Sequence, residues 1–246
     1  MRLAILSDVH ANREALESVL ADIAAQEIDQ LVFLGDIVGF GPDPSWCVDR
    51  VAELVAEGAL CLRGNHDRVV AAPEGKINSA ARRIIDWTLD RLNARQRLFL
   101  GELPFEIHLG EALFVHASAD QPDQWQPISD ATAAARSFDA CQARLIFCGH
   151  RHHAAIYSHD LNGKVCAQSI AERGAFPLLA SRRWLAVMGS VGQPRDGTQL
   201  ASYAIWDQPN AALRFRQIGY DVDTTVQKAR AVGLPEAFAR RLITGT

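Results

Sequence analysis

Short apolar runs alternate with helical patterns along the N-terminal part of the chain. Three runs are uniformly apolar and are followed by polar residues or glycine, which is typical of strands buried on both faces. They are residues 3–6, 31–34 and 59–62. Between them, residues 15–23 and 48–55 carry apolar side chains at helical spacing, with Asn12 as a candidate N-cap of the first helix and Pro44 in the first turn of the second. This strand–helix alternation predicts a parallel sheet with right-handed crossovers.

The rest of the chain continues with strands and helices in a less regular order. Further apolar runs predict strands at residues 112–115, 145–147, 184–187, 203–206 and 213–218. The last three are expected to form a second sheet. Residues 78–100 have a helical pattern, and the segment from residue 222 onward is helical with an interruption at Gly233-Leu234-Pro235. Because no repeat, low-complexity tract or long linker separates these segments, we expect a single domain over residues 1–246.

Composition and charge narrow the class of protein. The net charge of −4 gives no broad cationic field, so stable binding of nucleic acid is not expected. The five cysteines are an odd number without a Cys-x-x-Cys pair, which favours free thiols in a reducing cytoplasm. The N-terminal apolar run is too short for a signal peptide, and no stretch approaches the roughly 20 apolar residues of a membrane span. We therefore expect a cytoplasmic protein with no membrane partner.

Polar side chains that can bind metals follow five of the predicted strands. In chain order they are Asp8 and His10, Asp36, Asn65 with His66 and Asp67, His116, and His150 with His152. In an open α/β sheet the carboxyl ends of the strands share one edge, where ligands bind. The topology therefore predicts that residues far apart in the sequence meet at that edge.

Each of these residues has an ordinary explanation when it is taken alone. An aspartate caps a helix or lies in a turn, and a histidine forms a hydrogen bond in a loop. Five such coincidences at five strand ends favour a metal site instead. The seven oxygen and nitrogen ligands exceed the four of a structural zinc site, and they suit Mn²⁺, Fe²⁺, Zn²⁺ or Co²⁺. Two ions about 3.5–4 Å apart, joined by a bridging carboxylate, would use all seven.

The order of these residues resembles the calcineurin-like metallophosphoesterases. The matching blocks are Asp8-Val9-His10, Gly35-Asp36, Gly64-Asn65-His66-Asp67, His116 and Gly149-His150-Arg151-His152. Each block alone is a weak signal, but the ordered set is specific. The resemblance implies an α/β fold, a four-layer α/β/β/α sandwich of two facing mixed sheets flanked by helices.

The resemblance also implies a role for each residue. One metal ion would be held by Asp8, His10, Asp36 and His152, and the other by Asp36, Asn65, His116 and His150, so that Asp36 bridges them. Both would be divalent, with Mn²⁺ as the first choice and Zn²⁺, Fe²⁺ or Co²⁺ as alternatives. Water activated between the ions would attack phosphorus, and His66 would protonate the leaving group while Asp67 orients its imidazole.

Departures from the family pattern bear on the substrate. No arginine follows Asp36, where Gly39-Phe40 stand instead, which disfavours the serine/threonine protein phosphatases and favours a phosphodiester over a phosphomonoester. A phosphomonoesterase and a dinucleoside polyphosphate hydrolase are the alternatives for this small, phosphorylated and possibly nucleotide-derived substrate. A catalytically silent protein-binding scaffold and a metal-storage protein are the alternatives of another class, and the intact His66 argues against both.

Three further stretches could contribute to specificity. They are residues 40–46, residues 121–127 and the surroundings of Arg195, which lies in a segment, residues 189–197, that resembles the late loop of small bacterial and archaeal members of the family. Trp46 and Trp125 could stack on a base, although tryptophan is more often buried. His153 is expected to be a surface histidine or a neighbour of the ligands.

Overall fold

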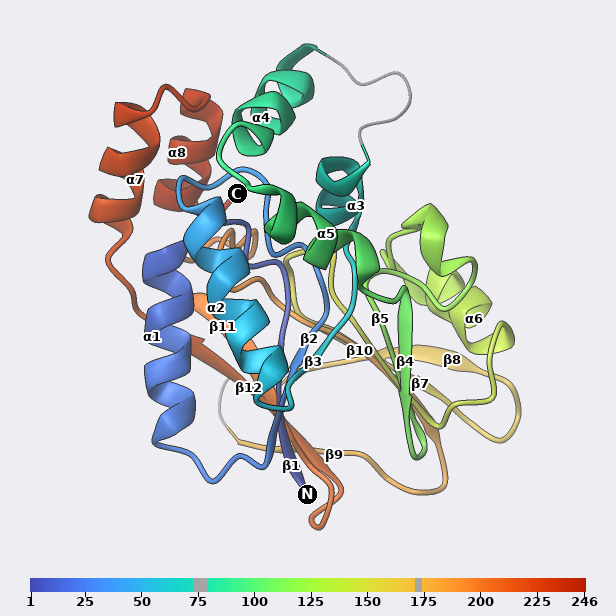
Figure 1. Cartoon of the computed structure of the whole chain (residues 1–246). Helices are drawn as coiled ribbons and strands as arrows, with labels where there is room; N and C mark the ends of the chain where they lie inside the picture. The colour runs from blue at the N-terminus through green and yellow to red at the C-terminus, as the bar shows by residue number, and fades with distance from the viewer. Residues whose placement is uncertain (73–78, 171–173) are drawn as a thin grey trace.

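Two facing six-stranded sheets form the centre of the computed structural model, which describes residues 1–72, 79–170 and 174–246 (Figure 1). In spatial order the first sheet contains β3 (Leu60–Cys61), β2 (Gln30–Phe33), β1 (Arg2–Leu6), β11 (Ala201–Asp207), β12 (Ala212–Ile218) and β9 (Phe176–Pro177). The strands β1, β2 and β3 are parallel, whereas β11 runs antiparallel to β1. The sheet is therefore mixed.

The second sheet is mixed as well. In spatial order it contains β4 (Glu106–Leu109), β5 (Ala112–Val115), β6 (Leu145–Cys148), β10 (Arg183–Val187), β7 (Ala155–His159) and β8 (Val165–Gln168). The strands β5, β6 and β10 are parallel, and the flanking strands β4 and β7 pair antiparallel with β5 and β10.

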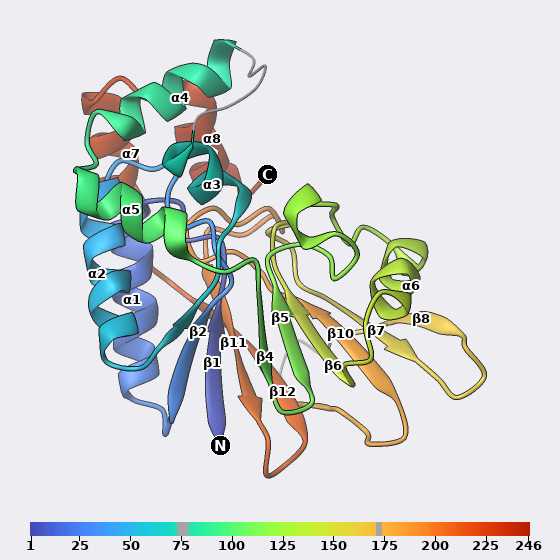
Figure 2. The ribbon, with the colours of Figure 1, turned by 45° about the vertical axis from the view of Figure 1, so that its right-hand side comes forward.

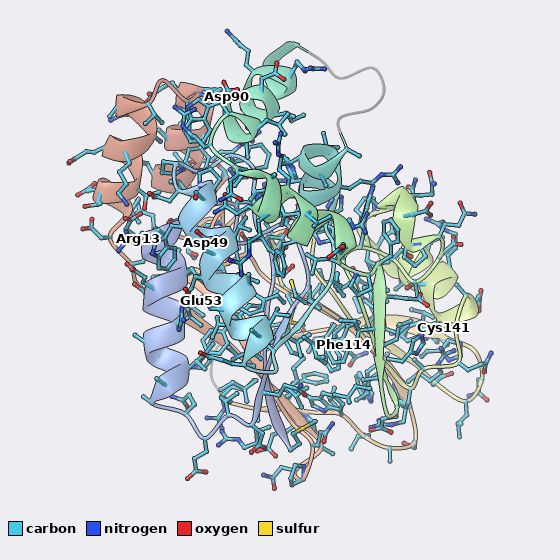
Figure 3. All side chains as sticks on the ribbon, viewed as in Figure 1. Arg13, Asp49, Glu53, Asp90, Phe114 and Cys141 are labelled. Carbon is cyan, nitrogen blue, oxygen red and sulfur yellow. The ribbon has the colours of Figure 1, made fainter. Side chains whose placement is uncertain are left out.

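Alternation along the strands separates three apolar layers. Leu3 and Ile5 point from β1 into the space between the sheets, where Phe114 also lies (Figure 3). Ala4 and Leu6 point the other way, toward helices α1 (Arg13–Ala24) and α2 (Pro44–Ala56). Since successive side chains of a strand face opposite sides, a strand buried on both faces reads as a continuous apolar run.

The remaining helices complete the outer layers and one end of the sandwich. Helix α6 (Ala131–Asp139) packs through Phe138 on the outer face of the second sheet. Further helices lie together at the end where β1 finishes (Figures 1 and 2). They are α3 (Asn65–Ala71), α4 (Ser79–Leu89), α5 (Ala94–Glu102), α7 (Val222–Ala231) and α8 (Glu236–Thr244). These layers confirm the predicted four-layer α/β/β/α sandwich.

The predicted partners of the late strands were partly wrong. We expected residues 184–187, 203–206 and 213–218 to form the second sheet together. Only β10 lies there, between β6 and β7, whereas β11 and β12 extend the first sheet beyond β1. Periodicity identifies a strand from its own residues, but its partner depends on which strand edge is left to pair in the folded chain.

The helical pattern over residues 78–100 contains two helices rather than one. Asn78 lies outside the described residues, and α4 ends at Leu89. Helix α5 begins at a capping box, in which the Asn93 side chain accepts from the Gln96 N–H and the Gln96 side chain accepts from the Asn93 N–H, both at 3.0 Å. This reciprocal pair restarts the helix although the apolar pattern runs on.

The five cysteines are free, as the sequence predicted. Burial raises the pKa values of the Cys47, Cys61 and Cys148 thiols above the ordinary value, so these thiols stay protonated and behave as small apolar side chains. Within the described ranges, no helix has both the length and the apolar character that a membrane crossing requires.

Candidate dinuclear metal centre

The predicted ligands meet where strands of both sheets end. Asp8, Asp36 and Asn65 follow β1, β2 and β3 of the first sheet, while His116 and His150 follow β5 and β6 of the second. We expected a single sheet to collect them along one edge, and this was wrong. The carboxyl ends of two facing sheets form the site together, because β5 and β6 are parallel to each other and end at the same side as β1.

Two glycines allow the ligand-bearing loops to approach each other. A Cβ atom on Gly64 would lie 2.1 Å from Asp36 Oδ1, and one on Gly149 would lie 1.8 Å from Ser7 Oγ. Because no side chain fits in these spaces, glycine in the two blocks brings the loop after β3 against the loop after β2, and the loop after β6 against β1.

Five of the seven predicted ligands have left-handed backbone conformations. The φ angles are 57° for Asp8, 49° for His10, 54° for Asp36, 67° for His150 and 58° for His152. A non-glycine residue in this region is uncommon, and such conformations cluster at functional sites with a strain of about 1–3 kcal/mol each. Their concentration at one place indicates that the fold maintains this geometry for a function.

One cluster contains Asp8, His10 and His152, all of them buried. The Nε2 atoms of His10 and His152 lie 3.1 Å apart, and His152 Nε2 lies 3.3 Å from Asp8 Oδ1. The Nδ1 atoms of the two rings face the carbonyl oxygens of Val38 at 3.2 Å and Gln193 at 2.6 Å. Since a carbonyl only accepts, Nδ1 carries the proton in each neutral ring, and the two Nε2 lone pairs face each other.

A second cluster surrounds Asp36 and His116. His116 Nε2 lies 3.4 Å from Asp36 Oδ2, 3.2 Å from Asn65 Oδ1 and 3.2 Å from His150 Nδ1. The other ring nitrogen, Nδ1, donates to the Leu34 carbonyl at 2.7 Å. Its Nε2 atom therefore faces two oxygens and another nitrogen. Asp36 Oδ2 also lies 3.7 Å from His10 Nε2, so this carboxylate stands between the two clusters.

These donor atoms fit divalent cations. Ligand atoms about 2.0–2.2 Å from one metal ion lie about 3.0–3.6 Å from one another, which is close to the spacing of the facing atoms in both clusters. Asp8 Oδ1 is buried and has no hydrogen-bond partner among the described residues. Facing lone pairs repel each other, and a buried carboxylate oxygen without a donor is costly, so a cation in the cluster of Asp8, His10 and His152 would remove both conflicts.

The charges of Asp8 and Asp36 also suit the binding of divalent cations. Burial opposes ionisation of Asp8, but His152 outweighs it and holds the pKa of Asp8 below its usual range. Burial also opposes ionisation of Asp36, but His116 and His66 together outweigh it and hold the pKa of Asp36 well below its ordinary value. Both groups are carboxylates at neutral pH, which is the form that binds metal.

The histidines differ from one another. Burial lowers the pKa of His10 well below 6.5 and lowers the pKa of His150 to about 4, so both rings are neutral and ready to bind metal. Burial acts in the same direction on His116, but the neighbouring Asp36 carboxylate outweighs it and raises the pKa of His116 to about 9. Metal binding would therefore displace a proton from His116.

His66 lies beside the clusters and is partly exposed. The backbone N–H of His66 donates to Asp36 Oδ1 at 2.8 Å. The centroid of its ring lies 5.1 Å from that of His10 and 4.6 Å from that of Phe40. A Cβ atom on Gly39, which has a φ of +94°, would lie 2.5 Å from His66 Nδ1. The imidazole thus rests on the backbone at Gly39 and against the phenyl ring. Burial lowers the pKa of His66 below its ordinary value.

The predicted contact between Asp67 and the His66 ring is absent from the described structure. Asp67 Oδ1 accepts from the N–H groups of Ile37 at 2.9 Å and Val38 at 3.2 Å, and Oδ2 accepts from the Gly64 N–H at 3.0 Å. Its third position in α3 turns the side chain back to the helix start, so both oxygens are used by the backbone. Asp67 joins two ligand-bearing loops and does not orient the imidazole.

Sequence reasoning missed several residues that hold the ligands. Ser7 Oγ donates to Asp8 Oδ2 at 2.6 Å, and Ser190 Oγ donates to the Asp8 carbonyl at 2.8 Å. Gln193 supplies the carbonyl that fixes His152. The only hint in the sequence was the resemblance of residues 189–197 to the late loop of the family. The contacts of this segment with β1 form only in the folded chain.

The other residues considered for specificity have separate places. His153 is exposed, and Trp46 packs under the Arg13 guanidinium at 4.8 Å on the outer helices. Trp125 is partly exposed and has a φ of +56°, and its ring lies 5.6 Å from the His116 ring. Of the two tryptophans, Trp125 is therefore the one that borders the site.

Comparison with known proteins agrees with the fold and the ligand pattern. The chain belongs to the calcineurin-like phosphoesterase superfamily, whose domain model matches residues 1–210. It is a metallophosphoesterase, a hydrolase that acts on phosphoric ester bonds.

Three similar proteins cover the chain almost completely. A metallophosphoesterase structure from Sphaerobacter thermophilus is similar with a TM-score of 0.89 and 36% identity, over 100% of this chain and 99% of that one. An uncharacterized protein of Methanocaldococcus jannaschii is 32% identical over 99% of this chain and 98% of its own. A hypothetical protein of Pyrococcus horikoshii shares the fold with a TM-score of 0.82 and 18% identity, over 100% of this chain and 98% of that one.

The role of Asp67 in joining two loops can be tested by Asp67→Asn. The amide nitrogen would meet a backbone N–H where a carboxylate oxygen now accepts, so we expect the free energy of unfolding to fall by about 2–3 kcal/mol. Urea unfolding measures this change, and Asp49→Asn on the exposed face of α2 is the control (Figure 3). An unchanged stability together with lost turnover would instead indicate that Asp67 acts on His66.

Proposed function

We propose that this protein hydrolyses phosphodiesters in preference to phosphomonoesters at a centre of two divalent metal ions, with Mn²⁺ as the preferred ion. Asp8, His10, Asp36 and His152 would hold one ion, and Asp36, Asn65, His116 and His150 the other. Ligand atoms converge in one cluster of Asp8, His10 and His152 and another of Asp36, His116 and His150, with Asp36 Oδ2 only 3.7 Å from His10 Nε2, and this supports the assignment. Imidazole, carboxylate and amide ligands suit Mn²⁺, Fe²⁺, Co²⁺ and Zn²⁺.

The observation that carries the preference for diesters is the pair of aromatic rings beside the clusters. Phe40 lies against His10 and His66, with ring centroids 4.9 Å and 4.6 Å away, at the place where an arginine after Asp36 would bind a phosphate dianion. Trp125 borders the other cluster beside His116. Aromatic surfaces favour organic ester groups over additional charge, and a diester has an organic group on each side of phosphorus.

The chain's own residues would position the reactants and move the proton. When bound, two divalent ions lower the pKa of a water molecule and neutralise charge on phosphate oxygens. Asp36 stands between the two clusters, and its Oδ1 also accepts from the His66 N–H. This bond fixes the start of α3, so that the His66 imidazole stands at the edge of the site. His66 would donate its proton to the leaving oxygen.

The protonation state of His66 depends on the substrate. Burial lowers its pKa in the free protein, whereas the nearby Asp36 charge acts in the opposite direction. A bound phosphate adds negative charge next to the ring and favours the imidazolium form. Substrate binding would therefore prepare the acid that the leaving group needs.

We also propose that residues 1–246 form one domain. Helix α7 is tied to the N-terminal part, because Lys228 pairs with Glu14 and with Asp43, the latter at 3.1 Å. The end of α8 is tied to the late loop, where the Gly197 N–H donates to the Gly245 carbonyl at 2.8 Å. These contacts join the C-terminal helices to the rest of the sandwich.

The preference can be tested with a matched pair of chromogenic esters. With Mn²⁺ present, we expect a higher kcat/KM for bis-p-nitrophenyl phosphate than for p-nitrophenyl phosphate, and loss of both activities with a chelator. The two substrates share a leaving group, so the ratio reports the second ester group. A preference for the monoester would contradict the proposal, and no turnover of either ester with both metals bound would indicate a binding scaffold.

Asp36→Ala is expected to reduce metal content more than any other single ligand change. The Asp36 carboxylate would bind both ions, so its removal leaves two cations close together without the charge between them. Metal analysis of the purified variant is the measurement, with Asp49→Ala as a control at an exposed position. About two ions per chain in Asp36→Ala would rule out the bridging assignment.

His66→Ala is expected to remove most turnover while both metal ions stay bound. A residue that donates a proton in the transition state contributes roughly 10²–10⁴-fold in rate. The loss should be large for alkyl esters and smaller for p-nitrophenyl esters, whose leaving group needs no protonation. His108→Ala, at an exposed position of β4, is the control. Loss of a metal ion, or an equal defect for every leaving group, would exclude the role as an acid.

A further inference from the structure

The loop after β10 brings one arginine to the metal clusters. The backbone N–H of Arg195 donates to the His152 carbonyl at 3.1 Å, and the His152 ring in turn donates to the Gln193 carbonyl. The same loop is held at β1, because the Gly192 N–H donates to the Asp8 carbonyl at 2.9 Å. The position of Arg195 is thus tied to two ligands of the same cluster.

The Arg195 guanidinium is only partly satisfied. Nη2 donates to Gln193 Oε1 at 2.9 Å, but Nε is buried without a hydrogen-bond partner. In the part of the chain that the structure describes, Arg195 forms no ion pair with a carboxylate. The side chain as a whole is partly buried, and its unpaired Nε leaves a hydrogen-bond donor for an anion from outside the chain.

Other arginines show what a structural role looks like in this fold. Arg63 donates to the carbonyls of Gly101 and Leu103, and Arg151, between two metal-binding histidines, donates to the carbonyls of Ile128 and Ser129. Each of these guanidinium groups holds a neighbouring loop. Arg195 has no such backbone contact from its side chain, so packing does not account for it.

The charges of two cluster carboxylates act on the Arg195 guanidinium. Burial lowers its pKa, and the positive charge of Arg241 on α8 acts in the same direction, whereas Asp8 and Asp36 act against both. The guanidinium is therefore within electrostatic reach of two carboxylates from the clusters. Divalent cations bound there would neutralise these carboxylates and leave Arg195 and Arg241 as unbalanced positive charges.

We propose that Arg195 binds a non-bridging oxygen of the substrate phosphate, with Gln193 orienting its guanidinium. This assignment rests on the proposed function, since it requires a phosphate ester at the metal clusters. The loop after Asp36 has no arginine, and the loop after β10 would then supply one instead. A diester has two non-bridging oxygens, so the metal ions and a single arginine are enough to contact both.

The test compares Arg195→Gln and Arg195→Lys with the wild type and with Arg240→Gln, an exposed arginine next to Arg241 on α8. Binding of inorganic phosphate to the Mn²⁺-loaded proteins is measured by calorimetry, and kcat and KM are measured for bis-p-nitrophenyl phosphate. We expect Arg195→Gln to bind phosphate about 10- to 100-fold more weakly and to lose kcat/KM by a similar factor. Arg195→Lys should be intermediate, because it keeps the charge and loses the fork of donors.

Metal content and urea unfolding separate the proposal from a structural role. We expect both to match the wild type in the two Arg195 variants and in Arg240→Gln. Unchanged phosphate affinity in a folded, metal-loaded Arg195→Gln would overturn the proposal, as would equal losses in the Gln and Lys variants together with lost metal. If the wild type hydrolyses neither ester but binds phosphate through Arg195, the proposed function fails and this inference stands.

Discussion

The convergence of ring nitrogens without a proton between them is the constraint on which the rest of the site depends. Backbone carbonyls hold the Nδ1 protons of His10 and His152, so their Nε2 lone pairs face each other at 3.1 Å, and His152 Nε2 lies 3.3 Å from the buried Asp8 Oδ1. Such an arrangement is unfavourable in an empty site and favourable around cations. The left-handed ligands and the close loops are features of the fold that keep these atoms in place, and they explain why the ligand blocks contain glycine at fixed places.

The two sheets meet in this site, and the late loop joins them. Ser190 and Gln193, from the loop after β10, contact Asp8 after β1 and His152 after β6. Strain in the ligand backbones is thereby opposed by hydrogen bonds from a segment far away in the sequence. Asp67 forms comparable hydrogen bonds within the first sheet, where it holds the loop after β2 against the start of α3. The candidate metal centre is therefore also a structural junction of the sandwich.

The surroundings of the clusters are not symmetric, and this bears on the substrate. Aromatic rings of Phe40 and Trp125 border the two clusters, while Arg195, whose guanidinium is incompletely paired, is bonded through its backbone to His152. Organic groups suit the rings, and a phosphate oxygen suits the cation. The proposed preference for diesters therefore depends on these three side chains and not on the ligand pattern that the family shares.

The sequence by itself determined the strands β1 to β3, their helices, and the identities of the clustered residues, because apolar period and ligand type are local properties of the chain. It also gave the four-layer fold through the ordered blocks from Asp8 to His152. Only the tertiary structure decided that β11 and β12 pair with the first sheet, that Asp67 binds backbone instead of His66, and that the Arg195 backbone bonds to the His152 carbonyl. Each of these depends on which groups are left unpaired once distant segments have met, and no local pattern contains that information.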